Sequence, residues 1–295
     1  MVEVSVRTVQ GRFLMRPRAK INDLILGVLG RAQAKYGVVI YVFTFLSNHY
    51  HMLLNVRDAK QLSRFMGFLD ANIAKEVGPI VSWSGHFWGR RYHSAILDPD
   101  EATQVERFRY ILSNSCKEGL VASPLKWEGV AAVRAICQGR ESLHGTWYDR
   151  TAAYRARCKG DLERFASRET VRLSPLPCWQ HLDSGEQRER ARAIVREIEL
   201  ETKSTHRRHR TKPLGMHYVK SRHPHERPES FRRSPAPRFH AATREGRWRL
   251  RRVIASIVSA YREAATRLKE GDLGAQFPTG CFPPPRPFVA SCAPG

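Results

Sequence analysis

The first 46 residues alternate short apolar runs with a segment of helical periodicity. The runs VEVSVRTV and RFLMRP predict two strands on either side of a turn at Gln10–Gly11. The next segment, INDLILGVLGRAQAKYG, repeats apolar residues at helical spacing and stops at Gly37, as helices commonly do. The run from Val38 to Leu46, VVIYVFTFL, is β-branched and aromatic throughout. It therefore predicts a central strand.

The alternation continues to about residue 119. HYHMLLNV predicts a strand that returns antiparallel to the preceding one, and Lys60 to Val77 predicts a helix ended by Gly78–Pro79. IVSWSGHFWGRRYHSAIL predicts a hairpin or bent strand, and a third helix follows with Asp98 as N-cap and Pro99 as first helical residue. This order predicts an α+β fold, a largely antiparallel sheet with helices on one face, of the ferredoxin-like kind.

Beyond residue 130 the pattern predicts a helical and basic C-terminal extension. We expect residues 131–202 to be mostly helical. Residues 203–245 are crowded with Arg, His, Pro and Ser, so we expect a basic linker that is disordered until it meets a polyanion. Residues 246–295 predict a helix from Trp248 to Lys269 and a proline-rich tail. The expected domain at residues 1–130 thus precedes three smaller segments.

The charge of the chain indicates a polyanionic partner. Lys and Arg number 50 against 28 acidic residues, which gives a net charge of +22 and a pI near 10.4. No apolar run approaches the roughly 20 residues of a membrane-spanning helix, and the N-terminal residues lack the apolar core of a secretion signal. The six cysteines form no CxxC pair, so reduced thiols are expected. We therefore expect a cytoplasmic protein that binds nucleic acid and no membrane.

Two histidines in the predicted strand HYHMLLNV are candidate metal ligands. Side chains alternate faces along a strand, so His49 and His51 share one side while Tyr50 and Met52 share the other. Two imidazoles on one rigid strand can bind a divalent cation if other groups complete the shell. In the alternative interpretation, one histidine is a surface residue and the other is partly buried for structural reasons. At a phosphate, Mg²⁺ or Mn²⁺ suits this basic chain better than a closed zinc site.

The third predicted helix offers a candidate nucleophile. At about 100° per residue, Val105, Phe108 and Leu112 form its buried stripe, and Tyr110 lies almost opposite. Asn114 follows four residues later, so its amide oxygen projects from the same face and can complete a His-His-Asn metal site beside the phenol. The alternative is an ordinary exposed tyrosine on a solvated face.

The two motifs resemble those of a known enzyme family. FLSNHYHMLLNV resembles the HUH motif of single-tyrosine HUH transposases, and RYILSNSCKEGLV resembles their nucleophile helix. The resemblance is to the REP-associated tyrosine transposases and their insertion-sequence relatives, and it covers about residues 5–130, including RTVQGRFLMRP, FWGRRY and WEGV. Residues 115–118, Ser-Cys-Lys-Glu, replace the family's Pro-Val-Arg-Ala, which bears on the subfamily rather than on the chemistry.

The resemblance implies a specific activity. His49, His51 and Asn114 would hold Mg²⁺ or Mn²⁺ at the scissile phosphate of single-stranded DNA, in hairpin or repeat sequences. Tyr110 would attack that phosphate to give a 5′-phosphotyrosine and a free 3′-hydroxyl. The implied function is a transposase and endonuclease that cleaves and rejoins DNA, acting as a monomer or a homodimer.

Cations interleaved with aromatic residues predict where the single strand binds. Trp88, Arg90 and Arg91 precede the third helix, and Lys117 shares the Tyr110 side of that helix. Such interleaving is typical of grooves in which bases stack and phosphates pair with cations. In the alternative interpretation, a tryptophan-rich hairpin covers the core and its arginines lie in water.

Three other functions are compatible with the same residues. A replication initiator or relaxase shares the histidine pair and the tyrosine, although the tyrosine motif is closer to the transposase pattern. A domesticated, non-catalytic nucleic-acid-binding protein would need only the basic surface. A zinc hydrolase could use His49 and His51, but it would leave Tyr110 and Asn114 without a role.

Overall fold

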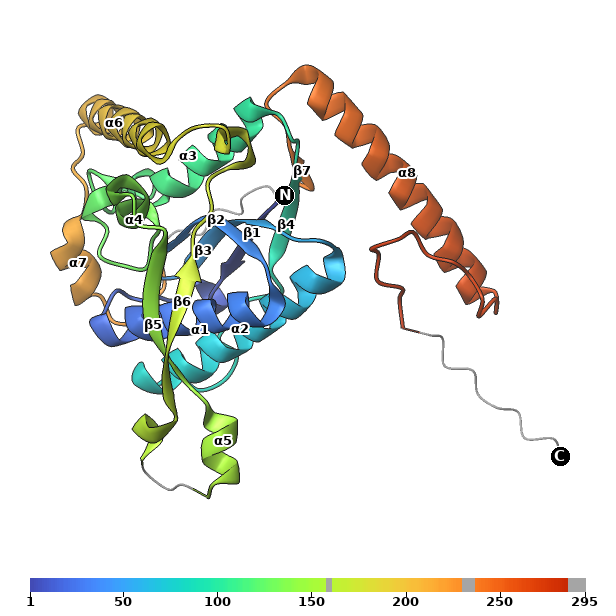
Figure 1. Ribbon diagram of the computed structural model, residues 1–295, viewed down its shortest axis with the longest axis horizontal. Helices are drawn as coiled ribbons and strands as arrows, with labels where there is room; N and C mark the ends of the chain where they lie inside the picture. Colours follow the sequence, from blue (N-terminus) through green and yellow to red (C-terminus); the bar gives the residue numbers. More distant parts are fainter. Residues whose placement is uncertain (158–160, 230–236, 286–295) are drawn as a thin grey trace.

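The protein is built on a five-stranded sheet, seen in a computed structural model that describes residues 1–157, 161–229 and 237–285 (Figure 1). The strand order is β2-β3-β1-β4-β7. Within these residues every pairing in the sheet is antiparallel except that of β4 with β7. The bounds are β1 Val2–Arg7, β2 Val39–Phe45, β3 His49–Asn55, β4 His93–Leu97 and β7 Phe239–His240. The predicted α+β class and largely antiparallel sheet are confirmed.

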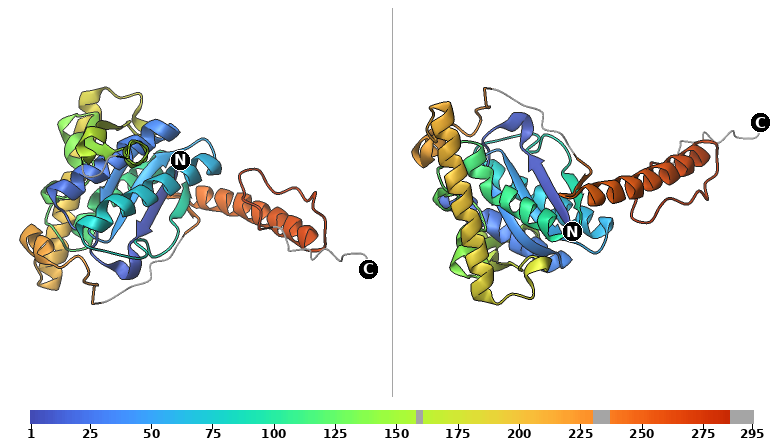
Figure 2. Two further views of the ribbon diagram at one scale, coloured as in Figure 1. Left: turned by 90° about the horizontal axis from the view of Figure 1, so that it is seen from below. Right: turned by 90° about the horizontal axis from the view of Figure 1, so that it is seen from above.

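Helices cover both faces of the sheet (Figure 2). On one face lie α1 (Ala19–Tyr36) and α2 (Ala59–Ile80), and the hydroxyl of Tyr50 on β3 donates to Asp70 of α2. On the other face lies α3 (Glu101–Lys117), where Thr44 Oγ1 of β2 donates to the Ile111 carbonyl at 2.9 Å. The expectation of helices on one face therefore holds for α1 and α2, whereas α3 forms an additional layer. Apolar side chains on both faces of β2 and β3 are buried, which is why layers form on both sides.

Two of the expected strands are shorter or absent. Residues 12–18, which include RFLMRP, form an irregular loop instead of a strand. In the expected hairpin of residues 80–97 only β4 is a strand. The preceding segment bonds to the end of β1 through Val9 N to Phe87 O at 2.9 Å and Gly89 N to Arg7 O at 2.9 Å. In these two segments, backbone N–H and C=O groups expected to pair within a sheet are thus hydrogen-bonded to nearby turns and loops instead.

Two helix boundaries also differ from the prediction. Helix α2 continues through Gly78 and Pro79 to Ile80, one residue beyond the proline expected to end it. Helix α3 begins at Glu101, and its N-cap is Asp100, whose carboxylate accepts from Thr103 N at 2.8 Å. Asp98, expected to be the N-cap, is buried instead and accepts two bonds of 2.8 Å from Arg249.

The segment expected to be mostly helical contains a β-hairpin. Its elements are α4 (Val133–Gln138), β5 (Ser142–Tyr148), α5 (Arg150–Arg155), β6 (Ala166–Arg172) and the start of α6 (Ser184–His209). The strands β5 and β6 pair antiparallel and pack across α1. Four short 3₁₀ helices complete the described elements, at Val9–Gly11, Pro124–Lys126, Leu162–Phe165 and Pro177–Trp179.

Most of the expected basic linker is ordered in the described residues. Helix α6 begins at a capping box formed by Asp183, and it buries Ile194 and Ile198 near α3. It extends to His209, past the predicted boundary at residue 202. Helix α7 spans Gly215–Ser221 and strand β7 spans Phe239–His240. The expected disorder is therefore wrong for these elements. Residues 230–236 lie outside the described residues, and the boundaries of the segments stay predictions.

The last helix, α8 (Arg244–Lys269), projects away from the sheet (Figures 1 and 2). The predicted helix is present, and it begins four residues earlier than expected. Trp248, Val253 and Ile257 are exposed along it. No helix in the described part of the chain is long and apolar enough to span a membrane. Residues 286–295, which include the end of the proline-rich tail, lie outside the described residues.

A glycine contact between α1 and β5 yields a stability prediction. A Cβ at Gly27 would lie 1.9 Å from the Thr146 carbonyl oxygen, so the two backbones touch and cannot admit a methyl group. We expect Gly27→Ala to lower the free energy of unfolding by about 1–3 kcal/mol. The control is Gly67→Ala on α2, where no atom lies within 4 Å. It should raise the free energy of unfolding by about 0.5–1 kcal/mol. Chemical denaturation measures both, and equal effects of the two substitutions would contradict the contact.

Candidate active site

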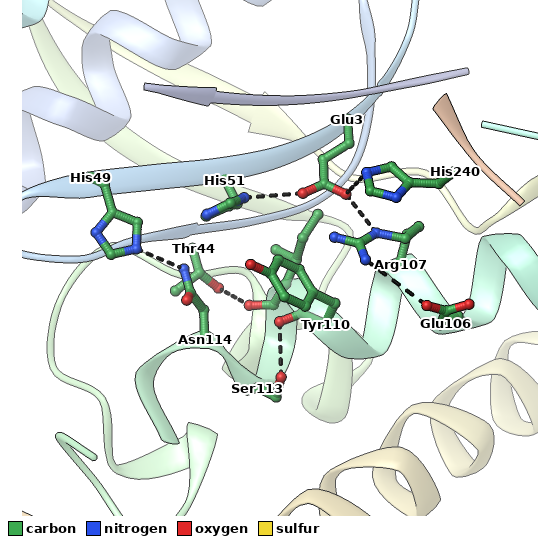
Figure 3. A network of polar contacts seen from close by, with 11 residues as sticks. Glu3, Thr44, His49, His51, Glu106, Arg107, Tyr110, Ser113, Asn114 and His240 are labelled. Atoms are coloured by element: carbon green, nitrogen blue, oxygen red, sulfur yellow. Dashed lines mark hydrogen bonds and ion pairs between the residues drawn. The ribbon is translucent and has the colours of Figure 1, made fainter. Parts of the chain in front are cut away.

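The structure brings the predicted nucleophile and metal ligands together on one face of the sheet (Figure 3). His49 and His51 project from β3 toward α3, and their ring centroids are 5.5 Å apart. The ring of Tyr110 on α3 lies 5.4 Å from that of His51. The side-chain nitrogen of Asn114, one turn further along α3, is 3.4 Å from His49 Nε2. Strand alternation and the four-residue helical spacing therefore bring these four side chains together, and their roles as ligands and nucleophile stay predictions.

The surrounding fold keeps β3 and α3 in register. Strand β3 pairs with β1 and β2, so both of its edges are held by backbone hydrogen bonds. The bond from Thr44 Oγ1 to the Ile111 carbonyl ties the middle of α3 to β2. His49 and Asn114 are 6% and 2% exposed, so their side chains have little freedom to move. The site is thus built on rigid elements rather than on loops.

Both imidazoles are oriented by an acceptor at Nδ1. His49 Nδ1 is 2.7 Å from Asn48 Oδ1, and His51 Nδ1 is 3.0 Å from Glu3 Oε1. Because both acceptors are oxygens, Nδ1 of each ring is the donor, which leaves Nε2 as the ring atom available to a metal. Burial, with smaller contributions from the charges of His51 and Arg7, lowers the pKa of His49 well below its usual value. His49 is therefore neutral at physiological pH, as a metal ligand must be.

This donor set fits a divalent cation. Metal-binding histidines generally donate their other ring nitrogen to a carboxylate or carbonyl oxygen, and both histidines do so here. Among the described residues no group of three or more His, Cys, Asp and Glu has a metal-binding arrangement. The remaining ligands would accordingly be the Asn114 amide oxygen, phosphate oxygens and water. A mixed nitrogen and oxygen shell with open positions suits Mg²⁺ or Mn²⁺ at a phosphate better than a structural zinc.

Glu3 is the buried centre of the polar network in Figure 3. Besides His51, its carboxylate accepts from Arg107 Nε at 2.7 Å and lies 3.5 Å from His240 Nε2. Burial alone would raise the pKa of Glu3, but the hydrogen bonds from His51 and Arg107 outweigh it and lower the pKa to about 2. Glu3 is thus a permanent negative charge that links β1, β3, α3 and β7.

Tyr110 is half-buried, not on an exposed face as the helical spacing predicted. The guanidinium carbon of Arg107 lies 4.0 Å from the centre of its ring, and Lys117 Nζ lies 4.4 Å from it. Burial, followed by the charge of Glu3, raises the pKa of the phenol above its usual value, although Arg107 opposes this. The phenol is therefore protonated at neutral pH, and two cations are in place to stabilise a phenolate.

Three of the four predicted DNA contacts lie apart from this cluster. Lys117 is in contact with Tyr110. Trp88 donates from Nε1 to the Asp70 carbonyl at 2.8 Å and packs edge to face against Tyr50, so it lies on the α2 face of the sheet. Arg90 and Arg91 are exposed near that same segment. The interpretation of Trp88 as a core-covering residue fits these contacts, and DNA binding by all four residues stays a prediction.

The C-terminal extension contributes a side chain to the site. Strand β7 pairs in parallel with β4, and Asp98 N donates to the His240 carbonyl at 2.9 Å. This pairing directs the His240 imidazole toward Glu3 and Arg107. Burial, and then the charge of Arg107, lowers the pKa of His240 to about 4. No sequence pattern linked His240 to Glu3, which lies more than two hundred positions earlier. Glu3 itself could have been singled out, because it is a charged residue that alternates with valines in the predicted strand VEVSVR.

The buried charge of Glu3 predicts a pH-dependent effect on stability. Glu3→Gln leaves Arg107 without its buried partner, so we expect the free energy of unfolding at pH 7 to fall by about 2–4 kcal/mol. Because the folded pKa is lowered from 4.5 to about 2, this stabilisation exists in full above pH 4.5. It is lost as the pH falls toward 2. The difference between wild type and variant in urea unfolding should shrink over that range.

The matched control for Glu3 is Glu106→Gln. Glu106 is also near Arg107, at 4.0 Å, but its side chain is 59% exposed. An exposed pair contributes little, so the change in stability should stay under about 1 kcal/mol. If Glu106→Gln costs as much as Glu3→Gln, the buried network does not have the role assigned to it.

Comparisons with known proteins agree with the motifs. Residues 15–114 match the family model described as "Transposase IS200 like". No curated protein matches the chain. Among solved structures, the chain is similar to a REP-associated tyrosine transposase bound to a REP hairpin, with 15% identity over 47% of this chain and 79% of that one and a TM-score of 0.38. It is also similar to a putative transposase from Deinococcus radiodurans, with 14% identity over 37% and 86% of the two chains and a TM-score of 0.28. The predicted resemblance is thereby confirmed: residues 15–114, which carry His49, His51, Tyr110 and Asn114, match the IS200-like transposases.

Proposed function

We propose that the protein is a metal-dependent transposase that cleaves and rejoins single-stranded DNA through Tyr110. The observation that carries the proposal is that a phenol, two oriented imidazoles and an amide occupy one site, with the rings of Tyr110 and His51 5.4 Å apart. The match to the IS200-like transposase model supports a transposase role. The net charge of +22 supports a DNA substrate.

In the proposed reaction, the Tyr110 oxygen attacks the scissile phosphorus and the bond from phosphorus to the 3′-oxygen breaks. The phenol loses its proton, and the departing 3′-oxygen gains one. Arg107 and Lys117, against the Tyr110 ring, favour the phenolate that forms. A divalent cation held by His49, His51 and Asn114 would supply polarisation of the phosphate. Because one phosphodiester replaces another, the 5′-phosphotyrosine retains the bond energy, and a 3′-hydroxyl can reverse the step without ATP.

All residues of the proposed reaction come from one chain. His49 and His51 lie on β3, Tyr110 and Asn114 lie on α3, and α3 packs directly on the face of the sheet that contains β2 and β3. A second subunit is therefore not required to complete the cluster. We infer that hairpin or repeat DNA is the substrate and that one chain can perform cleavage, while homodimer formation stays a separate prediction.

The assignment of the nucleophile predicts the effect of removing one oxygen. Tyr110→Phe should abolish the covalent protein–DNA adduct, because no other group replaces the phenol oxygen. Binding of hairpin DNA should persist, since it depends on many cations. The measurement is an SDS-resistant adduct formed with labelled single-stranded hairpin DNA and Mg²⁺. The control is Tyr92→Phe, a tyrosine whose ring centre lies 5.2 Å from the Arg91 guanidinium carbon. If Tyr110→Phe still forms the adduct, or peptide mapping places the nucleotide on Tyr92, the assignment is wrong.

The assignment of the metal ligands predicts a separation of cleavage from binding. His49→Ala or His51→Ala should reduce cleavage more than about 100-fold, because losing a ligand costs at least as much as losing an outer-shell partner. DNA affinity should change little. Asn114→Ala should be milder and should recover partly in excess Mn²⁺, because water can replace a neutral amide. His144→Ala, an exposed histidine on β5, is the control. Cleavage that survives EDTA would refute metal dependence.

A further inference from the structure

A cavity of about 300 Å³ opens directly beside His49. The core contributes Phe13 from the first loop, Asn48 from the turn between β2 and β3, and His49 from the start of β3. The C-terminal extension contributes Tyr218 of α7 and, after it, Arg222 and Arg227. Asn48 is the residue that holds His49 Nδ1 at 2.7 Å. The cavity therefore shares two residues with the imidazole end of the active site.

This part of the C-terminal extension is attached to the core by specific contacts. Leu214 N donates to the Gly119 carbonyl and Gly215 N donates to the Leu120 carbonyl, both at 2.9 Å. These two acceptors lie just after α3. Arg16 Nη1 donates to the Arg222 carbonyl, and Val219 is 5% exposed. The cavity is thus bounded by an ordered part of the segment that the sequence predicted to be a disordered linker.

We infer that this cavity binds one unstacked base of the DNA strand whose phosphate is cleaved by Tyr110. The inference rests on the proposed function, because it takes the strand to pass His49. A volume of about 300 Å³ lies at the lower end of small-molecule sites, and so it suits a single nucleotide rather than a duplex. Enzymes that act on one position of a nucleic acid commonly place a base in a pocket lined by aromatic side chains and polar groups.

The chemistry of the walls favours a base over a phosphate. Phe13 and Tyr218 both line the cavity and supply aromatic side chains against which a base can pack. Two carboxylates, Glu118 and Glu229, also line the cavity. They offset the positive charges of Arg222 and Arg227 on the same cavity, and they accept hydrogen bonds from the N–H groups that every base carries on its pairing edge. The guanidinium of Arg222 is held by Glu226 at 2.6 Å, so its charge is already partly neutralised.

The test uses the full-length protein and a single-stranded oligothymidylate that contains the photoreactive base 5-iodouracil. This probe needs no knowledge of the natural cleavage site. Cross-links should map to Phe13 or Tyr218. Tyr218→Ala should weaken binding by about 5-fold or more, the lower end expected for loss of one stacking contact. Tyr218→Phe should bind like wild type, because it retains the ring. The control is Tyr154→Ala, which removes a tyrosine that is 85% exposed on α5.

An abasic oligonucleotide of the same length separates base binding from backbone binding. It should bind to wild type and to Tyr218→Ala with equal affinity. Equal losses for abasic and thymidylate strands would show that the cavity holds sugar-phosphate, and cross-links confined to other aromatic residues would also overturn the inference. The adduct at Tyr110 tests the proposed function separately. If the adduct forms but Tyr218→Ala binds the strand like wild type, only the inference of a base site is wrong. If Tyr218 cross-links to the strand but no adduct forms, only the proposed cleavage reaction is wrong.

Discussion

A single buried carboxylate, Glu3, connects the elements on which the candidate active site depends. It bonds to His51 on β3 at 3.0 Å and to Arg107 on α3 at 2.7 Å, and it lies 3.5 Å from His240 on β7. A buried charge is tolerated only when partners satisfy it. The fold must therefore keep these three elements around β1, and in doing so it keeps the histidine strand facing the tyrosine helix.

The same network sets the electrostatic state of the nucleophile. The negative charge of Glu3 helps to raise the pKa of Tyr110, while Arg107, which Glu3 positions, lies against the phenol ring and opposes that effect. His51 is oriented by Glu3 with its other ring nitrogen left as a potential ligand. In the proposed reaction, the charge state of Tyr110 and the orientation of His51 are thus coupled through one side chain. His240 reaches Glu3 only because β7 pairs with β4, so the C-terminal extension forms part of the site.

Local periodicity explains which features were predictable from the sequence. The two-residue alternation of a strand places His49 and His51 on one side, and the four-residue helical spacing places Tyr110 beside Asn114. Contacts between distant segments leave no such pattern. Trp88 resembles a DNA-stacking residue in the sequence but packs on Tyr50. Disorder was expected for residues 203–229 because their composition is polar and basic. Helix α6 is nevertheless held by a few buried residues near α3, and α7 is held by hydrogen bonds to the residues just after α3.

The central claim is that β3 and α3 together form one metal site beside the nucleophile. Crystals of the protein soaked in Mn²⁺ test it directly, because anomalous scattering locates the ion without reference to activity. The account predicts one peak within about 2.0–2.3 Å of the Nε2 atoms of His49 and His51. The peak should also adjoin the Asn114 side chain, and it should be absent from the His49→Ala variant. A peak bound elsewhere, or one unaffected by that substitution, would contradict the account.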